Sequence, residues 1–172
     1  ALYKATGDTP IGIRDKAILT VYYGCGLRKS EGLNLEISDI LFERKLLYVR
    51  KAKNNHERYV PITTEGIKYI EHYLYDARPL LLGENNKTNI FFISERGGQM
   101  HPETIYLRIK ALQKKSAHPG LQSKSTGLHT LRHSIATHLL QAGMELENIA
   151  LFLGHRILDS TQLYTHLINE SQ

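Results

Sequence analysis

The chain has 172 residues, 41% of them hydrophobic and 23% charged, which suffices for the core of one globular domain. Lysine and arginine total 22 against 17 acidic residues, and this net charge of +5 slightly favours a polyanionic partner. The single cysteine, Cys25, excludes a disulfide framework and a cysteine-rich zinc site, and it fits a reducing compartment. No apolar run approaches the roughly 18 residues of a membrane span, and no signal-peptide pattern is present.

The first third of the chain predicts two helices. Residues 13–23 carry apolar side chains at helical spacing, and Gly24 and Gly26 end this helix. A short helix is expected to begin near Arg28. Residues 46–62 hold two β-type runs around a polar connection, which predicts a hairpin.

The remainder is mostly helical. A helix is expected over residues 64–78 with Thr64 as a candidate N-cap, and a short strand over Ile90 to Ile93. Further helices are predicted at 102–116, 129–141, 146–153 and 158–168, the last three separated by Gly143 and Gly154. Without repeats or a clear linker, we expect one domain over residues 1–172, mainly α with a small antiparallel sheet.

Positive charge is concentrated in two segments. Residues 44–58 carry six basic side chains against one acid, and residues 108–124 carry five against none. Such clusters fit either a nucleic-acid footprint or two solvated surfaces, and charge alone does not separate the two. The candidate DNA contacts from these segments are Lys51, Arg58, Lys114 and Lys115.

The segment LHTLRHSIATHLLQAG, residues 128–143, places His129 and Arg132 on one helix face, with Leu131, Ile135 and Leu139 on the buried side. An arginine fork with an imidazole can grip a phosphate, although a lone H-x-x-R usually lies in an ordinary helix.

His129 and His133 stand four residues apart, which is also the spacing of a metal pair. The H-E-x-x-H pattern is absent and no third ligand lies nearby, so we expect no metal site. His133 is instead predicted to be buried and hydrogen-bonded, and His138 to lie at the surface or in packing.

Four further residues could contribute chemistry. In LFLGHRILDSTQLYTHL, residues 151–167, Gly154 places His155 at a turn, and Tyr164 follows on the next helix. A tyrosine hydroxyl has a pKa of about 10, so it needs neighbouring cations to act as a nucleophile; most such tyrosines only pack. Arg28, after a glycine turn, fits an anion site or an ordinary surface position. Lys53, at the predicted hairpin tip, could be solvated, bind phosphate or donate a proton.

Taken in order, the segments GLRKSEGLNL, VRKAKNNHERYVPI, HTLRHSIATHLL and LGHRILDSTQLYTHL closely resemble the catalytic domain of the tyrosine recombinases, the integrase family of site-specific recombinases. The resemblance runs from residue 26 to residue 167. It implies that family's α+β catalytic-domain fold, a double-stranded DNA partner and no metal or other cofactor. It also implies an origin in a bacterial mobile element and a cytoplasmic, nucleoid-associated location.

The resemblance assigns roles residue by residue. Tyr164 matches the nucleophile that forms a 3′-phosphotyrosyl link, and Arg28 and Arg132 match the arginines that clamp the phosphate. His129 and His155 match the positions that hydrogen-bond the phosphate, with His129 as the candidate base. Lys53 matches the lysine that protonates the leaving 5′-oxygen, and Glu31 matches a supporting acidic residue.

Some positions depart from the family pattern. Ala52 and Asn54 replace the glycines that often flank the hairpin lysine, and Lys51 nearby is an alternative acid. Gly32 stands where an apolar residue is common, and Arg156 where a small residue is frequent. We expect an isolated catalytic domain without the family's N-terminal DNA-clamping domain. Family members assemble as homotetramers on DNA, whereas the isolated domain could be monomeric.

Two other functions remain open from the sequence. Type IB topoisomerases share the tyrosine chemistry, although the compact motif spacing here argues against them. A basic DNA-binding module without catalysis would use Arg28, Arg132 and the histidines only to hold phosphate.

Overall fold

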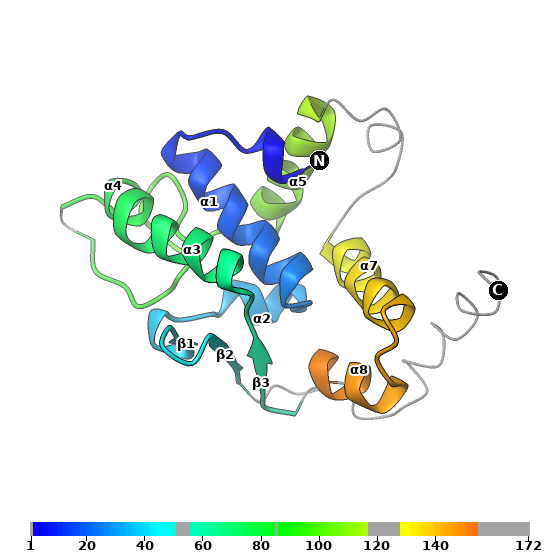
Figure 1. Ribbon diagram of the computed structural model, residues 1–172. Coiled ribbons are helices and arrows are strands. Elements are labelled where there is room, and N and C mark those ends of the chain that lie inside the picture. Colours follow the sequence, from blue (N-terminus) through cyan, green and yellow to red (C-terminus); the bar gives the residue numbers. More distant parts are fainter. Residues whose placement is uncertain (1, 51–55, 85, 117–127, 155–172) are drawn as a thin grey trace.

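A computed structural model describes residues 2–50, 56–84, 86–116 and 128–154, with His129 described by its backbone only (Figure 1). The helices are α1 Pro10–Leu19, α2 Lys29–Leu33, α3 Thr64–His72, α4 Arg78–Leu82, α5 Pro102–Lys115, α7 Leu128–Gln141 and α8 Leu146–Leu153. Short 3-10 turns span Tyr3–Ala5 (η1) and Ile37–Asp39 (η3), and π-helical turns span Thr20–Gly24 (η2) and Tyr73–Ala77 (η4). The strands are β1 Ile40–Leu41, β2 Leu46–Val49 and β3 Arg58–Pro61.

Helix α1 runs through the middle of the molecule, between α3, α5 and the sheet (Figure 1). Thr9 caps its first turn by accepting a hydrogen bond from the Gly12 amide at 3.1 Å, so the helix begins at Pro10 rather than at residue 13. Its buried positions include Arg14 and Asp15 as well as apolar residues. The predicted single apolar stripe is therefore too narrow a description, because the helix is covered on several sides.

The two buried charged side chains of α1 both make hydrogen bonds, although Arg14 Nε is buried without a partner among the described residues. Arg14 donates from Nη1 to the Ile93 carbonyl oxygen at 3.0 Å, and Asp15 accepts a forked contact from Arg108, with Nη2 to Oδ2 at 2.7 Å. Arg108 belongs to the second basic segment, residues 108–124. One of the five positive charges of that segment is therefore neutralised inside the fold. The side chain of Asp15 has no exposed surface, which explains the need for that partner.

The sheet is antiparallel with strand order β1-β2-β3. The β2–β3 pairing confirms the predicted hairpin, with Leu47 opposite Val60 and Val49 opposite Arg58. Strand β1 was not predicted, because two residues are too short to show alternation. Residues 90–93 do not form a strand: they contribute only the isolated bridges Glu36–Ile90 and Ile93–Gln99.

The predicted helix at 64–78 is realised as α3, η4 and α4 in succession, and Thr63 rather than Thr64 caps it, accepting from the Gly66 amide at 3.0 Å. The helices predicted at 102–116, 129–141 and 146–153 match α5, α7 and α8. The helix predicted at 158–168 lies outside the described residues.

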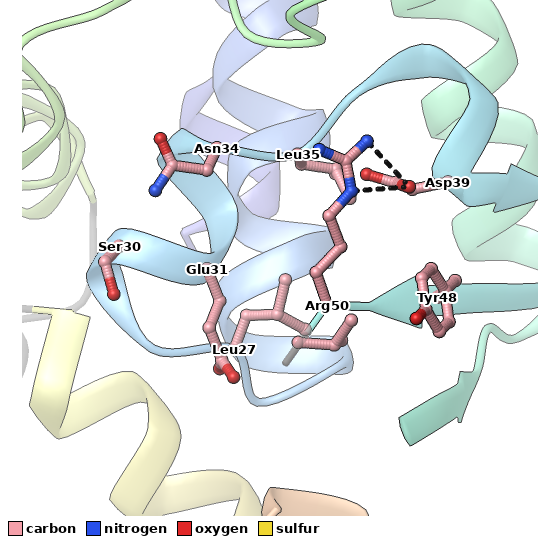
Figure 2. A pocket seen from close by; sticks show the side chains of 9 residues that line it. Leu27, Ser30, Glu31, Asn34, Leu35, Asp39, Tyr48 and Arg50 are labelled. Atoms are coloured by element: carbon pink, nitrogen blue, oxygen red, sulfur yellow. Dashed lines mark hydrogen bonds and ion pairs between the residues drawn. The ribbon is translucent and has the colours of Figure 1, made fainter. Parts of the chain in front are cut away.

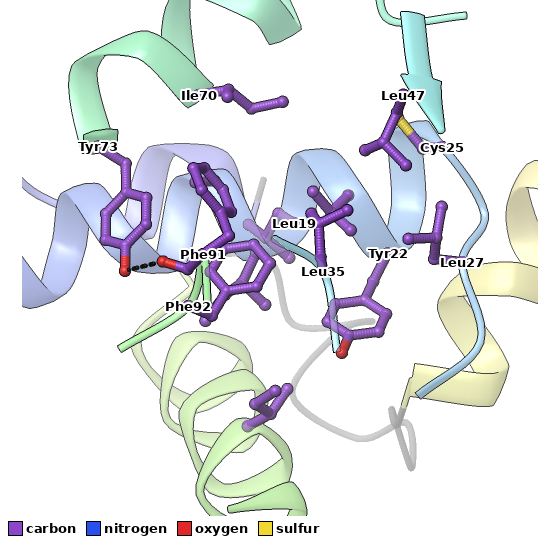
Figure 3. Close-up of a cluster of buried hydrophobic side chains, with 14 of the residues drawn as sticks. Leu19, Tyr22, Cys25, Leu27, Leu35, Leu47, Ile70, Tyr73, Phe91 and Phe92 are labelled. Atoms are coloured by element: carbon purple, nitrogen blue, oxygen red, sulfur yellow. Dashed lines mark hydrogen bonds between the residues drawn. The ribbon is translucent and has the colours of Figure 1, made fainter. Parts of the chain in front are cut away.

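The main core joins α1 to α3, α5 and the sheet, and Figure 3 shows its aromatic centre, where the Tyr73 hydroxyl donates to the Phe91 carbonyl oxygen at 2.8 Å. A second apolar cluster, formed by Ala136, Leu140, Ile149 and Leu153, holds α7 against α8. Helix α7 also packs on η2, and α8 packs on β3. These contacts bring the C-terminal end of α8 and the first residue of β3 to the start of α2. In the described part of the chain, no helix has the length and apolarity to cross a membrane.

Candidate active site

Arg28 is the N-cap of α2, after a turn that depends on Gly26. Gly26 has a φ of +65°, and a Cβ there would lie 3.0 Å from Phe152 and 3.1 Å from Leu153, so the close approach of α8 favours glycine. The side chain of Arg28 is half-buried, and its Nε is buried without a hydrogen-bond partner among the described residues. A buried donor without a partner is costly, and an anion would satisfy it.

Glu31 is the centre of the site. Its carboxylate accepts from the Arg28 amide at 2.7 Å, closing the first turn of α2, and its side chain is only 2% exposed. Burial alone would raise the pKa of Glu31, but the hydrogen bonds and charge of Arg58, the Arg28 amide and the charge of Arg132 together lower it below its ordinary value. The carboxylate therefore stays ionised inside the protein.

Arg132 reaches from α7 to two separate main-chain oxygens. Its Nη1 donates to Gly26 at 2.6 Å and its Nη2 to Leu153 at 2.7 Å, while Nη1 lies 3.9 Å from the Glu31 carboxylate. Arg132 is itself buried, on the side of α7 that also carries Ala136. This corrects the expectation that Arg132 lies on a face away from the buried side of the helix. Since Gly26 is two residues before Arg28, the contact ties α7 to the turn that precedes Arg28.

Arg58 was predicted as a DNA contact, and its position does not fit that role. Its side chain is 6% exposed and forms a double contact with Glu31, Nη1 to Oε2 at 2.7 Å and Nη2 to Oε1 at 3.1 Å. The sequence held a signal for this burial: Arg58 precedes Val60 by two residues on β3, and alternate residues of a strand share one face.

The end of α8 is closed by the same two arginines. The Phe152 carbonyl oxygen accepts from Arg58 Nε at 2.8 Å, next to the Leu153 oxygen that Arg132 occupies. Cations at a helix C-terminus are favourable because the last carbonyls lack intrahelical partners. Gly154 follows in the left-handed conformation, φ +73°, and a Cβ there would lie 2.5 Å from Arg58 Nη1. Glycine at 154 thus lets the chain turn over Arg58 immediately before His155.

The first basic segment has a second paired arginine. Arg50, just after β2, donates to the Asp39 carboxylate at 3.2 Å and also contacts Glu36. Arg50 and Asp39 border a pocket of about 200 Å³ between α2 and the end of β2, where Figure 2 shows Arg50 directed at Asp39. The contact anchors the strand end that leads toward Lys53. Together with Arg58, it means that two of the six basic residues of this segment are neutralised by acids from other segments.

Several predicted residues lie outside the described part: Lys51, Lys53, His155, Tyr164 and the side chain of His129. Lys114 and Lys115 are exposed in the last turn of α5, at the opposite end of the molecule from α8 (Figure 1). The structure therefore does not bring them to the arginine pair.

The expectation for His133 is wrong in one respect, because its side chain is exposed rather than buried. The buried row of α7 is formed by Leu128, Leu131, Arg132, Ala136 and Leu140 at helical spacing, and His133 falls outside it. His138 is exposed as predicted, and its Nδ1 lies 2.5 Å from the Tyr23 hydroxyl. Within the described ranges, no group of three acidic, histidine or cysteine side chains could hold a metal ion.

Comparison with known proteins identifies the family and the fold of the chain. The model of the phage integrase family matches residues 1–171. Tyrosine recombinase XerD of Proteus mirabilis is 42% identical over 163 residues, which cover 95% of this chain and 50% of that protein. The chain thus spans about half the length of the curated relatives it matches.

Solved structures show the same fold. The crystal structure of XerA recombinase superposes with a TM-score of 0.83 at 32% identity, covering 99% of this chain and 60% of the other. XerH site-specific recombinase bound to difH substrate, a pre-cleavage complex, gives a TM-score of 0.79 at 24% identity, covering 99% of this chain and 49% of the other. The mainly helical fold with a small antiparallel sheet is the catalytic-domain fold of tyrosine recombinases, as the sequence predicted.

Proposed function

This chain belongs to the phage integrase family, and on that premise we propose that it is the catalytic part of a site-specific recombinase that cleaves and rejoins DNA strands. We infer that its substrate is double-stranded DNA; XerH site-specific recombinase, which has the same fold, is described as bound to difH substrate. The role we infer is integration and excision of a mobile genetic element. The working assembly is a homotetramer on DNA.

The reaction is a phosphoryl transfer to Tyr164. Its phenolate oxygen attacks the scissile phosphorus, a new P–O bond forms, and the bond to the 5′-oxygen breaks. Lys53 donates a proton to that leaving oxygen, and His129 accepts the proton of the tyrosine. The phosphotyrosyl link conserves the phosphodiester bond energy, so a second 5′-hydroxyl can reseal the strand by the reverse reaction.

Arg28 and Arg132 stabilise the charge that develops on the non-bridging phosphate oxygens. His155 adds a hydrogen bond to the same phosphate. Glu31 supports the arrangement from beneath, because its carboxylate closes the turn that carries Arg28 and lies 3.9 Å from Arg132. The two arginines, together with Lys53, supply the positive charge that the reaction needs.

One observation carries most weight for this proposal. Arg132 is bonded at 2.6 Å to the Gly26 oxygen, two residues from Arg28, whose buried Nε has no partner in the described ranges. A buried arginine donor without a partner, two residues along the chain from an oxygen that a second arginine holds, fits a site for a tetrahedral anion such as a phosphodiester.

The test is capture of the covalent intermediate. A pool of duplexes with randomised sequence and a nick beside the candidate scissile position acts as a suicide substrate, because the short 5′ fragment leaves and prevents resealing. Wild-type protein is expected to accumulate a protein–DNA adduct, and Tyr164→Phe to form none. Tyr75→Phe is the matched control, since Tyr75 is 67% exposed on η4, and it should behave as wild type.

Three results would contradict the proposal. An adduct that persists in Tyr164→Phe removes the assigned nucleophile. Relaxation of supercoiled plasmid without any sequence preference favours a type IB topoisomerase. Salt-dependent DNA binding without an adduct on any duplex favours a non-catalytic binding module.

The role of Lys53 as the general acid has its own test. A substrate with a 5′-bridging phosphorothiolate has a leaving group that needs no proton, so it should largely restore cleavage by Lys53→Ala. Failure of that rescue moves the role to Lys51 or elsewhere.

A further inference from the structure

We propose that Arg58 is a positioning residue for the cleavage reaction: it holds Glu31 and the end of α8 together and thereby keeps Arg132 directed at the phosphate. This inference rests on the proposed function and extends it to a residue that does not itself meet DNA. The resemblance to the recombinases assigns Arg58 no role.

Arg58 joins three elements through one guanidinium. From β3 its Nη1 and Nη2 grip the Glu31 carboxylate of α2 at 2.7 and 3.1 Å, and its Nε donates to the Phe152 oxygen of α8 at 2.8 Å. A planar fork makes these contacts in fixed directions, which a lysine ammonium cannot reproduce. The contacts therefore set the distance between the turn carrying Arg28 and the helix end that precedes His155.

The same guanidinium determines which cation Glu31 holds. Arg58 lies 2.7 Å from the carboxylate, whereas Arg132 lies 3.9 Å away and spends its donors on the Gly26 and Leu153 oxygens. If Arg58 is removed, a buried carboxylate loses its main partner, and Arg132 is the next cation in reach. We expect Glu31 then to draw Arg132 toward itself and out of alignment with the phosphate.

The position of Arg58 argues against direct DNA binding. Its side chain is 6% exposed, and Gly154 covers it so closely that a Cβ would lie 2.5 Å from Nη1. Burial alone does not separate Arg58 from Arg132, whose side chain is 7% exposed, but charge pairing does. Arg58 is neutralised by the Glu31 carboxylate at 2.7 Å, whereas Arg132 contacts two main-chain oxygens and lies 3.9 Å from that carboxylate. The charge of Arg58 therefore acts inside the fold.

The experiment measures adduct formation on the suicide duplex selected with wild-type protein. The variants are Arg58→Met, Arg58→Lys and the double variant Arg58→Met with Glu31→Gln. The control is Arg96→Met, which removes one positive charge from an exposed position. At saturating DNA we expect Arg58→Met to lower the rate constant about 10- to 100-fold, the cost of a small misplacement of catalytic groups. DNA affinity and its salt slope should stay at the values of Arg96→Met, because no phosphate contact is lost.

The other variants separate positioning from simple loss of folding. Arg58→Lys retains the charge but not the fork, so its rate constant should lie between wild type and Arg58→Met. In the double variant the neutral amide that replaces the Glu31 carboxylate cannot attract Arg132 by charge, yet it still offers an oxygen to the Arg28 amide. Part of the rate should therefore return. Both variants remain informative if Arg58→Met alone does not fold.

Two outcomes overturn the inference while leaving the proposed function intact. One is an unchanged rate constant at saturating DNA in Arg58→Met. The other is weaker binding with a shallower salt slope in Arg58→Met, which would make Arg58 a phosphate contact. If wild-type protein forms no adduct, the proposed function itself fails, and this inference fails with it.

Discussion

Arg132 donates a hydrogen bond from Nη2 to the main-chain oxygen of Leu153 at 2.7 Å, so a residue assigned to phosphate binding also closes the C-terminus of α8. Its Nη1 holds the Gly26 oxygen at 2.6 Å. The guanidinium is thus fixed by the backbone on two sides before any ligand arrives. Fixing a cation in advance lowers the reorganisation needed when charge develops in the transition state.

Replacing Arg132 with lysine should therefore impair both folding and chemistry. A single ammonium cannot reach both oxygens in the directions of the guanidinium fork, and a buried carbonyl left without its donor costs about 1–3 kcal/mol. We expect urea denaturation of Arg132→Lys to give a free energy of unfolding lower by about 2 kcal/mol, and adduct formation slower by at least about 100-fold. Arg96→Lys is the exposed control. Stability equal to wild type would show that the two backbone contacts contribute nothing net.

Glu31 predicts a specific acid sensitivity. Burial raises its pKa, but Arg58, the Arg28 amide and Arg132 together bring it below the ordinary value of 4.5. A carboxyl whose pKa is lower in the folded state stabilises the protein above the pKa of the unfolded chain, and this contribution disappears as the pH falls through the folded pKa. Glu31→Gln should cost about 3 kcal/mol at pH 7, because two buried arginines lose their counter-charge.

The measurement is urea unfolding of wild type and Glu31→Gln between pH 7 and pH 3. The gap in unfolding free energy between the two proteins should be constant at neutral pH and narrow below about pH 4.5, since only the wild type loses the contribution of this carboxylate. A gap that stays constant down to pH 3 would contradict the assignment.

Gly32, a departure from the family pattern, is explained by Tyr22. A Cβ at residue 32 would lie 2.3 Å from Cζ and Oη of Tyr22, whose hydroxyl donates to the Lys29 oxygen at 2.9 Å. Helix propensity alone favours alanine over glycine by about 1 kcal/mol. We nevertheless expect Gly32→Ala to destabilise the protein by about 1–3 kcal/mol, because the fully buried ring cannot move without strain.

Gly98→Ala provides the control, since nothing lies within 4 Å of a Cβ at that position. Thermal unfolding of the two variants should therefore differ clearly, with Gly98→Ala close to wild type. An unchanged or higher melting temperature in Gly32→Ala would mean that Tyr22 has room to shift.

The single thiol offers a probe of the turn before Arg28. Burial raises the pKa of Cys25 to about 12, against a smaller opposing effect of the Arg58 charge, so the thiol is neutral at pH 8 and inert toward disulfide reagents. We expect a chromogenic disulfide to label native protein only through opening, with labelling in urea following the unfolding transition seen by circular dichroism. Rapid labelling in native buffer would show that this turn opens independently.

The sequence by itself determined the helices of the described residues, the pairing of β2 with β3 and the order of the motifs. These features are local: helical spacing, strand alternation and glycine stops are visible within windows of a dozen residues. The alternation of buried and exposed residues on β3 also indicates that Arg58 is buried, which a count of charges does not show. By contrast, β1 and the bridges at Ile90 and Ile93 have no local pattern, because they exist only through their partners.

Only the tertiary structure decided what each arginine does. Arg58 meets Glu31 across 27 residues of sequence, and Arg132 meets Gly26 across 106. The net charge of +5 gave no indication of these pairings, because it counts Arg50, Arg58 and Arg108 as available to a polyanion. In the fold these three are paired with acids from other segments: Arg58 with the buried Glu31, Arg108 with the buried Asp15, and the exposed Arg50 with Asp39. The charge that remains for a polyanionic partner is therefore set by packing and not by composition.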